Sequence, residues 1–471
     1  MAYRYGDRSQ SSLFPPCVDD YVPRDASVRA YDAMVEALDF KELGIEIEPN
    51  NVGNPQYDPK SMLKLHVYGI AYGVRSSRKL EREANYNISF IWLMKQLKPD
   101  HKTIAEFRRK NKKALQNVLK QCARMCLKLE LIEGNTLFTD GSKIRANAGM
   151  KSEWTKERCE KVLKRADENI DKILKECESI DLQEENQPSH IKMREDLSDR
   201  RALKSKVLGI LSDLKHENKE QFNATDPECA VMHSTKGSYP AYNTQIVVDE
   251  KHGLIVSADA TSDNNDLLQF AGQIGQANET LQSACSTACA DAGYANTPEL
   301  EKVARQNIKV VVPSIAQASK PKPFAKKNFV YDKEKDFYTC PEGNILTYRG
   351  TNAKGARVYV IVKNACKHCA HFGVCTKVKI GRAIQRFKDE ELKEKFEALY
   401  KQPDCQEIYG LRKSKVELPF GHIKRNLKFD SFLLRGKEGA KAEMSLASTC
   451  FNIARMITIF GVTDLVQKLQ G

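Results

Sequence analysis

The chain has 471 residues, and its 75 lysines and arginines outnumber 62 aspartates and glutamates, which gives a formal net charge of +13. This length allows two to four domains, and the dispersed positive charge predicts a broad contact surface for an anionic partner. The N-terminus has no apolar signal region, and the apolar stretch at 451–462 is interrupted by Asn452 and Arg455. We therefore expect a cytoplasmic protein without a membrane-spanning segment.

The N-terminal part of the sequence has helical spacing. Residues 1–26 are polar and are expected to be disordered, whereas 27–133 carry apolar residues at helical intervals, with Asp100 or Thr103 as the cap of one helix. Basic clusters at 75–79 and 108–113 fit either a helical bundle with solvated charges or a DNA-binding bundle that contacts phosphates. We favour DNA binding because of the acidic residues that follow.

The middle of the chain alternates between strands and helices. Residues 134–150 contain a strand, and 151–222 predict a helical hairpin inserted after it, whose apolar stripe is a packing seam. Within 223–314, strands are expected at 242–249, 254–261, 286–290 and 309–313, with helices at 264–282 and 298–307. This order predicts a mixed α/β sheet. Residues 315–388 are expected to be an irregular cysteine-bearing insertion, and helices resume over 389–471.

Three acidic residues stand out along this pattern. Asp140 ends an apolar run, Asp291 follows a predicted strand, and Glu417 lies in a basic stretch. Carboxylates at strand ends are the ligands that hard metal ions prefer, and a few of them hold the ions used on phosphate backbones. Singly, each acid fits a plainer interpretation, because Asp is common in turns and the sequence SKVE at 414–417 matches a helix capping box.

The order of the surrounding motifs favours the catalytic interpretation. TDGSKIRAN (139–147), YPAYNTQ (239–245), ADAGY (290–294), VELPFGHIK (416–424) and FLLRG (432–436), followed by Glu443 and Asn452, closely resemble bacterial insertion-sequence transposases of the DDE class. YGIAYGVRSSRKL (68–80) and PDHKTIAEFR (99–108) resemble the helical N-terminal domain of the same proteins. The resemblance covers about residues 28 to 460 and implies a ribonuclease-H-like mixed-sheet catalytic core behind an all-α domain.

The resemblance implies roles for individual residues. Asp140, Asp291 and Glu417 take the places of the catalytic triad, on the first strand, at the end of the fourth strand and on a late helix. Related transposases carry Tyr, Arg and Lys seven and four residues before and seven after the Glu; here Gly410 stands at the first place, Lys413 at the second and Lys424 at the third. Pro419 predicts that Glu417 lies at a helix edge or kink.

Other polar and basic residues extend this picture. Asn243 and Gln245 are expected on one strand face near the site, and Asp266 is expected to start a helix. The candidate DNA contacts are Arg75, Arg78, Lys79, Arg108, Arg109, Lys413, Lys415, Lys424, Arg425 and Arg435.

The fourteen cysteines, in a long chain without a secretion signal, predict free thiols rather than a disulfide framework. Cys340, Cys366, Cys369 and Cys375 have a spacing that suits a structural Zn²⁺ site, with His368 and His371 as substitute ligands. The alternative is a group of unrelated thiols in an irregular insertion.

The sequence therefore predicts an insertion-sequence transposase that binds terminal inverted repeats and joins cut ends to target DNA, using two Mg²⁺ or Mn²⁺ ions held by the three acids. Its expected partners are double-stranded transposon-end and target DNA, bound by a homodimer at the bacterial nucleoid. The rival hypotheses are a silent or domesticated DNA-binding protein and a ribonuclease-H-like nuclease without strand transfer.

Overall fold

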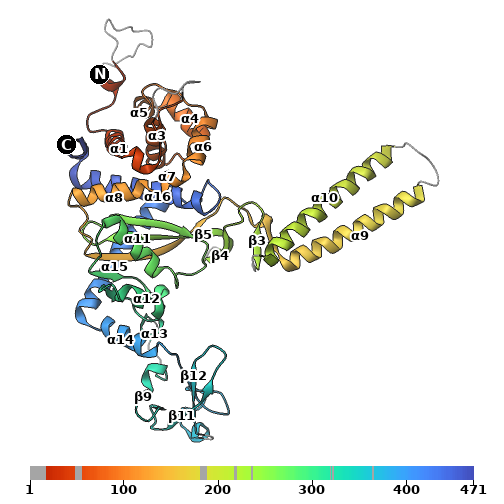
Figure 1. The fold of residues 1–471 in the computed structure, drawn as a ribbon, viewed down its shortest axis with the longest axis vertical. Coiled ribbons are helices and arrows are strands. Elements are labelled where there is room, and N and C mark those ends of the chain that lie inside the picture. The colour runs from red at the N-terminus through yellow and green to blue at the C-terminus, as the bar shows by residue number, and fades with distance from the viewer. Residues whose placement is uncertain are drawn as a thin grey trace, which may run out of the picture.

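The computed structural model describes residues 17–47, 56–180, 188–216, 220–234, 237–318, 320, 323–362 and 365–470, with the side chains of 176–180 and 188–194 left out (Figure 1). The N-terminal part is all-helical, as predicted. Its elements are η1 (Val18–Tyr21), α1 (Ser27–Glu36), α2 (Phe40–Leu43), α3 (Pro59–Ala71), α4 (Ser77–Tyr86), α5 (Ile88–Leu93), α6 (His101–Lys110), α7 (Lys112–Gln116) and α8 (Val118–Lys128). Asp100 caps α6 by accepting a 2.6 Å hydrogen bond from the Thr103 amide.

The segment just before α1 is ordered, which differs from the predicted tail over 1–26. Asp19 of η1 forms a 2.9 Å ion pair with Arg29 and accepts a 2.7 Å hydrogen bond from the Trp92 indole. These contacts fix η1 on the helical domain. Residues 1–16 of the predicted tail lie outside the described residues.

The centre of the molecule is a mixed six-stranded sheet, as predicted. Its strands are β1 (Thr136–Arg145), β4 (Ala230–Ser234), β5 (Gly237–Asp249), β6 (Ile255–Thr261), β7 (Thr287–Cys289) and β8 (Lys309–Val311). They are ordered β4-β5-β1-β7-β8, and β6 also pairs with the long strand β5. β5 is antiparallel to β1, β4 and β6, whereas β7 is parallel to both β1 and β8. α11 (Phe270–Leu281) and α12 (Thr297–Ala304) precede β7 and β8.

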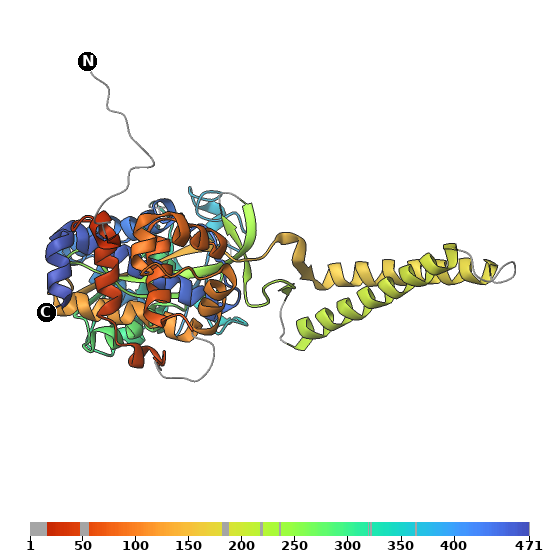
Figure 2. The ribbon, with the colours of Figure 1, turned by 90° about the horizontal axis from the view of Figure 1, so that it is seen from above.

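The C-terminal helices join the helical domain to the sheet. They are α14 (Glu390–Tyr400), α15 (Pro403–Arg425), α16 (Lys437–Phe460) and α17 (Val462–Gln470), after the short α13 (Ile315–Ala318). α16 is buried along most of its length and contacts α3, α7 and α8 on one side and β6 on the other, as the two views agree (Figures 1 and 2). A single hydrophobic core therefore runs through the helical domain and the sheet.

Two polar residues of α16 connect this helix to the sheet and to the helical domain. The Asn452 amide exchanges two 2.8 Å hydrogen bonds with the backbone of Ile255 at the start of β6. Glu443 accepts from the Leu433 and Leu434 amides and forms a 2.7 Å ion pair with Arg75. The polar residues that end the motif string thus hold the fold together.

α16 is also the helix to consider when asking whether the chain contains a membrane-spanning segment. In the described part of the chain, no single helix is long and apolar enough to cross a membrane, and only α16 and α17 taken together, bent by 110°, pass by length and composition.

Two insertions extend from the sheet. η2 (Met150–Ser152), β2 (Glu153–Thr155) and β3 (Gln221–Asn223) form the base of an arm made of α9 (Lys156–Ile180) and α10 (Pro188–His216), which projects from the body in both views (Figures 1 and 2). Cys159, Val207, Ile210 and Leu214 bury their side chains between the helices, so the predicted stripe is a packing seam. The segment that joins the two helices of the predicted hairpin, residues 181–187, lies outside the described residues.

The second insertion is a small sheet at the end of the molecule opposite the helical domain (Figure 1). It consists of η4 (Lys326–Asn328), β9 (Val330–Asp332), β10 (Phe337–Thr339), β11 (Ile345–Thr351), β12 (Arg357–Ile361), η5 (Ala365–His368) and β13 (Ala383–Arg386). All five strands are antiparallel to their neighbours. The prediction of an irregular segment over 315–388 is therefore wrong, because short strands with mixed polar and apolar residues carry a weak periodic signal.

Candidate active site

Two parallel strands bring Asp140 and Asp291 together. Phe138 of β1 pairs with Cys289 of β7; Asp140 stands two residues further along β1, and Asp291 stands two residues beyond the end of β7. Side chains two residues apart point to the same face of a strand. Asp291 leaves β7 to cap η3 (Ala292–Tyr294), where its carboxylate accepts a 2.8 Å hydrogen bond from the Gly293 amide. The two carboxylates therefore emerge at one level of the sheet.

Arg412 of α15 links these two carboxylates. Its Nη1 lies 3.3 Å from Asp140 Oδ1, and its Nη2 lies 3.9 Å from Asp291 Oδ2. The Arg412 side chain is only 16% exposed, so this cation is held inside the site. The guanidinium also lies over the Tyr409 ring, 5.8 Å from its centroid.

These two residues correct the sequence assignment. Tyr409 and Arg412 each stand one residue before Gly410 and Lys413, where the resemblance placed a Tyr and an Arg. Lys413 is exposed, and a Cβ at Gly410 would meet no atom within 4 Å. A continuous helix explains the difference, since Arg412 shares the inward face with Val416, Pro419 and Ile423.

The helix is continuous because α15 runs through Pro419 to Arg425. The predicted helix edge at Pro419 and the capping box at 414–417 are therefore wrong. Ser414 lies inside the helix, and its hydroxyl donates to the Leu411 carbonyl at 2.8 Å. Burial of Pro419 against the core compensates for the backbone hydrogen bond that proline cannot make.

Glu417 is exposed on α15 between two anchored cations. It stands five residues after Arg412 and seven before Lys424, so it lies about 7.5 Å and about 10.5 Å from them along the helix axis. Lys424 points to β1, where its Nζ contacts the Ser142 hydroxyl and the Lys143 carbonyl, the latter at 3.4 Å. Since residues seven apart are only about 20° apart around a helix, Glu417 faces the same side as Lys424, but it lies about 140° around the helix from Arg412, which contacts the two aspartates.

A third aspartate, Asp266, completes the acidic cluster. Its Oδ1 accepts hydrogen bonds from the Asn243 amide at 2.7 Å and from the Gln245 amide at 2.6 Å. The Gln245 Oε1 in turn accepts from the Tyr294 hydroxyl. The predicted helix-start role of Asp266 is wrong, because α11 begins only at Phe270. The expected shared face of Asn243 and Gln245 is confirmed, since both amides reach the same oxygen.

Two glycines leave the room that this cluster needs. A Cβ on Gly141 would lie 2.6 Å from Asp266 Oδ1 and 2.6 Å from Gln245 Nε2. A Cβ on Gly293 would lie 2.9 Å from Asp291 Oδ1 and 3.6 Å from Asp266 Oδ2. A side chain at either position would force these hydrogen-bonded groups to move, and Asp266 lies close to the glycines that follow Asp140 and Asp291.

The cluster carries more negative charge than its one cation balances. Burial raises the pKa of Asp140 to about 6, the Arg412 guanidinium opposes this rise, and the Asp291 and Asp266 carboxylates add to it. A buried carboxylate with a raised pKa and acidic neighbours marks a place where a divalent cation is stabilised. In the described part of the chain, no group of three or more His, Cys, Asp or Glu side chains is arranged to hold a metal ion.

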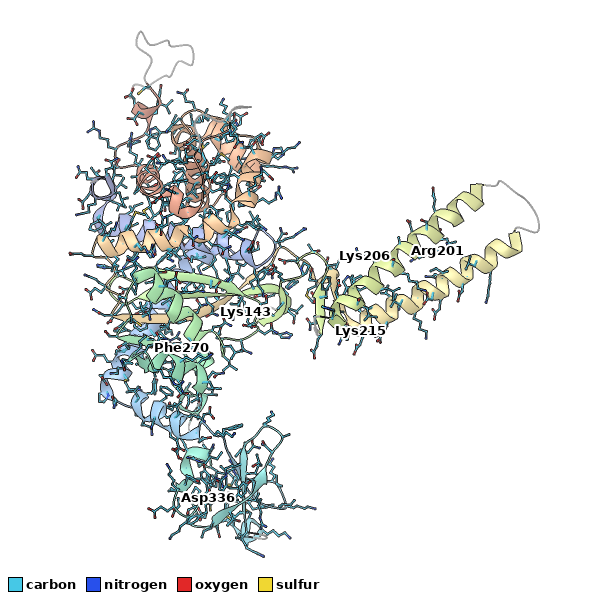
Figure 3. All side chains as sticks on the ribbon, in the orientation of Figure 1. Lys143, Arg201, Lys206, Lys215, Phe270 and Asp336 are labelled. Carbon is cyan, nitrogen blue, oxygen red and sulfur yellow. The ribbon has the colours of Figure 1, made fainter. Side chains whose placement is uncertain are left out.

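The predicted DNA contacts separate into two groups. Arg75 and Arg108 are structural: Arg75 lies 3.8 Å from the Phe429 ring centroid and is paired with Glu443, and Arg108 donates to the Arg75 carbonyl at 3.4 Å. The exposed residues are Arg78, Lys79, Arg109, Lys413, Arg425 and Arg435, and Lys415 and Lys424 are half-buried. Figure 3 shows further cations, Arg201, Lys206 and Lys215, along the arm helix α10.

The four candidate zinc ligands lie in one place. Cys340, Cys366, Cys369 and Cys375 line a single small pocket of the five-stranded module, together with His371. His368 is exposed and is not among the lining residues. The alternative of unrelated, scattered thiols does not describe this arrangement.

Comparison with protein families defines the class of protein. A model described as a transposase DDE domain matches residues 339–457, and one described as a transposase domain, DUF772, matches residues 16–110. Both matches indicate a transposase. Together they confirm the resemblance to DDE-class transposases; the DDE match includes Arg412 and Glu417 but not Asp140 or Asp291.

The remaining comparisons are with solved structures and with curated proteins. A similar solved structure is a piggyBac transposase in a synaptic complex with hairpin DNA, 9% identical in sequence, with a TM-score of 0.33 over 94% of this chain and 78% of that one. A search of curated proteins finds no match.

Proposed function

We propose that this transposase cleaves DNA at the ends of an insertion sequence and joins them to target DNA, with Asp140, Asp291 and Glu417 as its catalytic acids. The observation that carries the proposal is the convergence of Asp140 and Asp291 at one level of adjacent parallel strands, bridged by Arg412. A ribonuclease-H-like core is supported by the positions of the acids on the first strand β1, after β7, which is the fifth strand of the sheet in chain order and not the fourth as expected, and on the late helix α15.

The acidic cluster fits two Mg²⁺ or Mn²⁺ ions by its chemistry. Asp140 and Asp291 would supply hard oxygen ligands, burial together with the neighbouring carboxylates raises the pKa of Asp140 to about 6, and Glu417 of α15 would add a third carboxylate. When bound, such ions activate the attacking oxygen and stabilise the charge of an in-line phosphoryl transfer. The bridging guanidinium of Arg412 keeps the two aspartates close when no ion is present.

The remaining polar residues position this cluster. Asn243 and Gln245 hold one oxygen of Asp266, which leaves the other toward Gly293 and Asp291. Lys424 and Arg412 flank Glu417 along α15, where cations orient phosphate oxygens beside the acids. Neither cation needs to transfer a proton for this role.

The exposed cations give the proposed DNA surface. Arg78, Lys79 and Arg109 belong to the helical domain, and Lys413, Arg425 and Arg435 flank the site. Exposed Lys and Arg neutralise phosphates and make binding strongly dependent on salt. We place the protein in the bacterial cytoplasm, at the nucleoid, and propose that it acts as a homodimer because two ends are cut together.

The test is a DNA-processing assay with the inverted repeats that flank the coding region. With Mg²⁺, wild-type protein is expected to give nicks at the repeat ends and joined products. Asp140→Ala and Asp291→Ala are expected to lose cleavage by on the order of 10³-fold or more while still binding the ends.

The outcomes separate the rival functions. Binding without nicks in wild-type protein would support a silent DNA-binding protein, and nicks without joined product would support a plain nuclease. Glu407→Ala, which changes an exposed acid on the same helix α15, serves as the matched control and should leave cleavage unchanged.

A further inference from the structure

The five-stranded module has a very small hydrophobic core. Among the described residues, its buried apolar core consists of Phe329, Tyr338, Leu346, Tyr359, Ile361, Cys366 and Ile384. Cores of this size rarely stabilise an independent sheet, and small modules of this kind usually need a disulfide or a metal ion. The module therefore needs a further source of stability.

The first cysteine lies in a tight turn between β10 and β11. Cys340 donates its amide to the Asn344 carbonyl at 2.8 Å, and Gly343, with φ of +79°, donates to the Cys340 carbonyl at 2.9 Å. The Asn344 amide then donates to the Cys340 sulfur at 3.3 Å. A backbone N–H directed at a sulfur stabilises its thiolate form, which is the form that binds metal.

The other three cysteines follow β12 and close the same pocket. Cys366 lies in η5, and the Cys369 amide donates to the Cys366 carbonyl at 3.3 Å. The Cys375 amide donates to the His371 carbonyl at 2.9 Å. All four cysteine side chains therefore line the same pocket.

The pocket also contains an unpartnered buried donor. Arg382 lines it, and among the described residues the Arg382 Nε is buried without a hydrogen-bond partner, although the Nη atoms donate to the Cys375 and Phe324 carbonyls at 3.4 and 3.2 Å. A buried N–H without a partner is costly. A thiolate in this pocket is an acceptor that would satisfy it, as donors around metal-bound sulfurs commonly do.

The histidines are less suited to be ligands than the four thiols. His368 is exposed, and His371 Nε2 forms a 3.1 Å contact with Glu342 Oε1. Four cysteines with a Cys-x₂-Cys pair match the tetrahedral sulfur set that selects Zn²⁺.

We propose that Cys340, Cys366, Cys369 and Cys375 bind one structural Zn²⁺ ion that fastens the β10–β11 turn to the segment after β12. Each thiol that binds releases its proton to solvent and donates a sulfur lone pair to the metal, without oxidation or reduction. Because these side chains share the pocket without a metal-ready arrangement, binding requires rotation of the thiols about their Cα–Cβ bonds. The site is far from the acidic cluster along the chain and is independent of the proposed reaction.

The test measures metal in the full-length protein purified without chelator. Wild-type protein is expected to carry about one zinc ion per chain by elemental analysis. Reconstitution with Co²⁺ should give the intense thiolate-to-cobalt charge-transfer band of a tetrahedral sulfur site. Cys369→Ser should lose the zinc, whereas Cys229→Ser, which changes another half-buried cysteine outside the module, should keep it.

A second measurement covers variants that fail to fold. In folded wild-type protein, the four thiols should resist modification until a zinc chelator is added, and mass spectrometry should then locate the new modifications at the four positions. Absence of zinc and cobalt binding, with free reactivity of these thiols from the start, would overturn the proposal. A disulfide between Cys366 and Cys369 in the wild-type protein would overturn it as well.

Discussion

The acidic cluster and the cysteine pocket are two candidate metal sites that differ in how much of the hydrophobic core surrounds them. Asp140 and Asp291 project from a sheet whose core is continuous with the helical domain and α16. The four cysteines lie in a module with seven buried apolar residues among those described. The acids therefore keep their places without a ligand, held by backbone register and by Arg412, whereas the thiols have little else to hold their module together.

This difference predicts how substitutions at each site should affect activity and folding. In a well-supported site, a ligand side chain is free to carry unfavourable charge because the fold does not depend on it. In a weakly supported site, the ligand side chains themselves contribute to folding. Variants of the acidic cluster should thus change activity and charge while leaving the fold intact.

The largest effect in the acidic cluster is expected for Glu417→Gln. It removes a carboxylate without changing the shape of an exposed position on α15. DNA cleavage should fall on the order of 10³-fold, with the melting temperature unchanged. Glu407→Gln on the same helix is the control, and equal activity of the two variants would remove Glu417 from the site.

A smaller loss is expected for Arg412→Gln, which frees both aspartates from their bridging cation. Cleavage should decrease about 10²-fold, since one oriented cation beside the acids is lost. Lys413→Gln is its matched control and should only weaken DNA binding. A larger effect of Lys413→Gln would restore the role that the sequence gave to Lys413.

Gly141→Ala tests whether the sheet supports the cluster by close packing. The added methyl group would clash with Asp266 and Gln245, so the protein should be destabilised by about 1–3 kcal/mol and lose activity. Gly272→Ala in α11, where a Cβ meets no atom within 4 Å, should instead gain about 0.5–1 kcal/mol. Denaturant unfolding measures both, and a neutral Gly141→Ala would show that the site is loosely packed.

The last prediction concerns the charge of Asp140. Its pKa in the folded protein, about 6, lies above the ordinary value of 3.8, so ionisation of Asp140 destabilises the folded protein increasingly as the pH rises from about 4 to about 6. Asp140→Asn should therefore exceed wild type in unfolding free energy by less than about 1 kcal/mol near pH 4 and by about 3 kcal/mol at pH 7, since each pKa unit corresponds to about 1.4 kcal/mol. Unfolding measured at both pH values checks this.

Divalent cations provide the control for that experiment. Mg²⁺ should stabilise wild type at pH 7 and narrow its difference from Asp140→Asn, because the ion neutralises the same excess charge. If the difference in unfolding free energy between wild type and Asp140→Asn were the same at pH 4 and at pH 7, the buried-charge interpretation would be contradicted.

Much of the molecule was predictable from sequence because periodic patterns encode local structure. The helical domain, the mixed sheet and the β5–β6 hairpin follow from such patterns. Asp140 and Asp291 were proposed from an apolar run and a predicted strand, and the structure places them close together because β1 and β7 are parallel neighbours; their catalytic role stays a prediction. By contrast, the short strands β9–β13 were missed because their polar and apolar residues alternate too weakly.

The sequence by itself determined which acids and thiols are present and the elements that carry Asp140 and Asp291. The tertiary structure decided which cations and further polar groups face them. Arg412 rather than Lys413 bridges the aspartates because α15 continues through Pro419, and a one-residue change rotates a side chain by about 100° around a helix. Arg75 and Arg108 are half-buried in contacts within the fold, and Asp266 joins the acids; both outcomes depend on contacts between segments far apart in sequence.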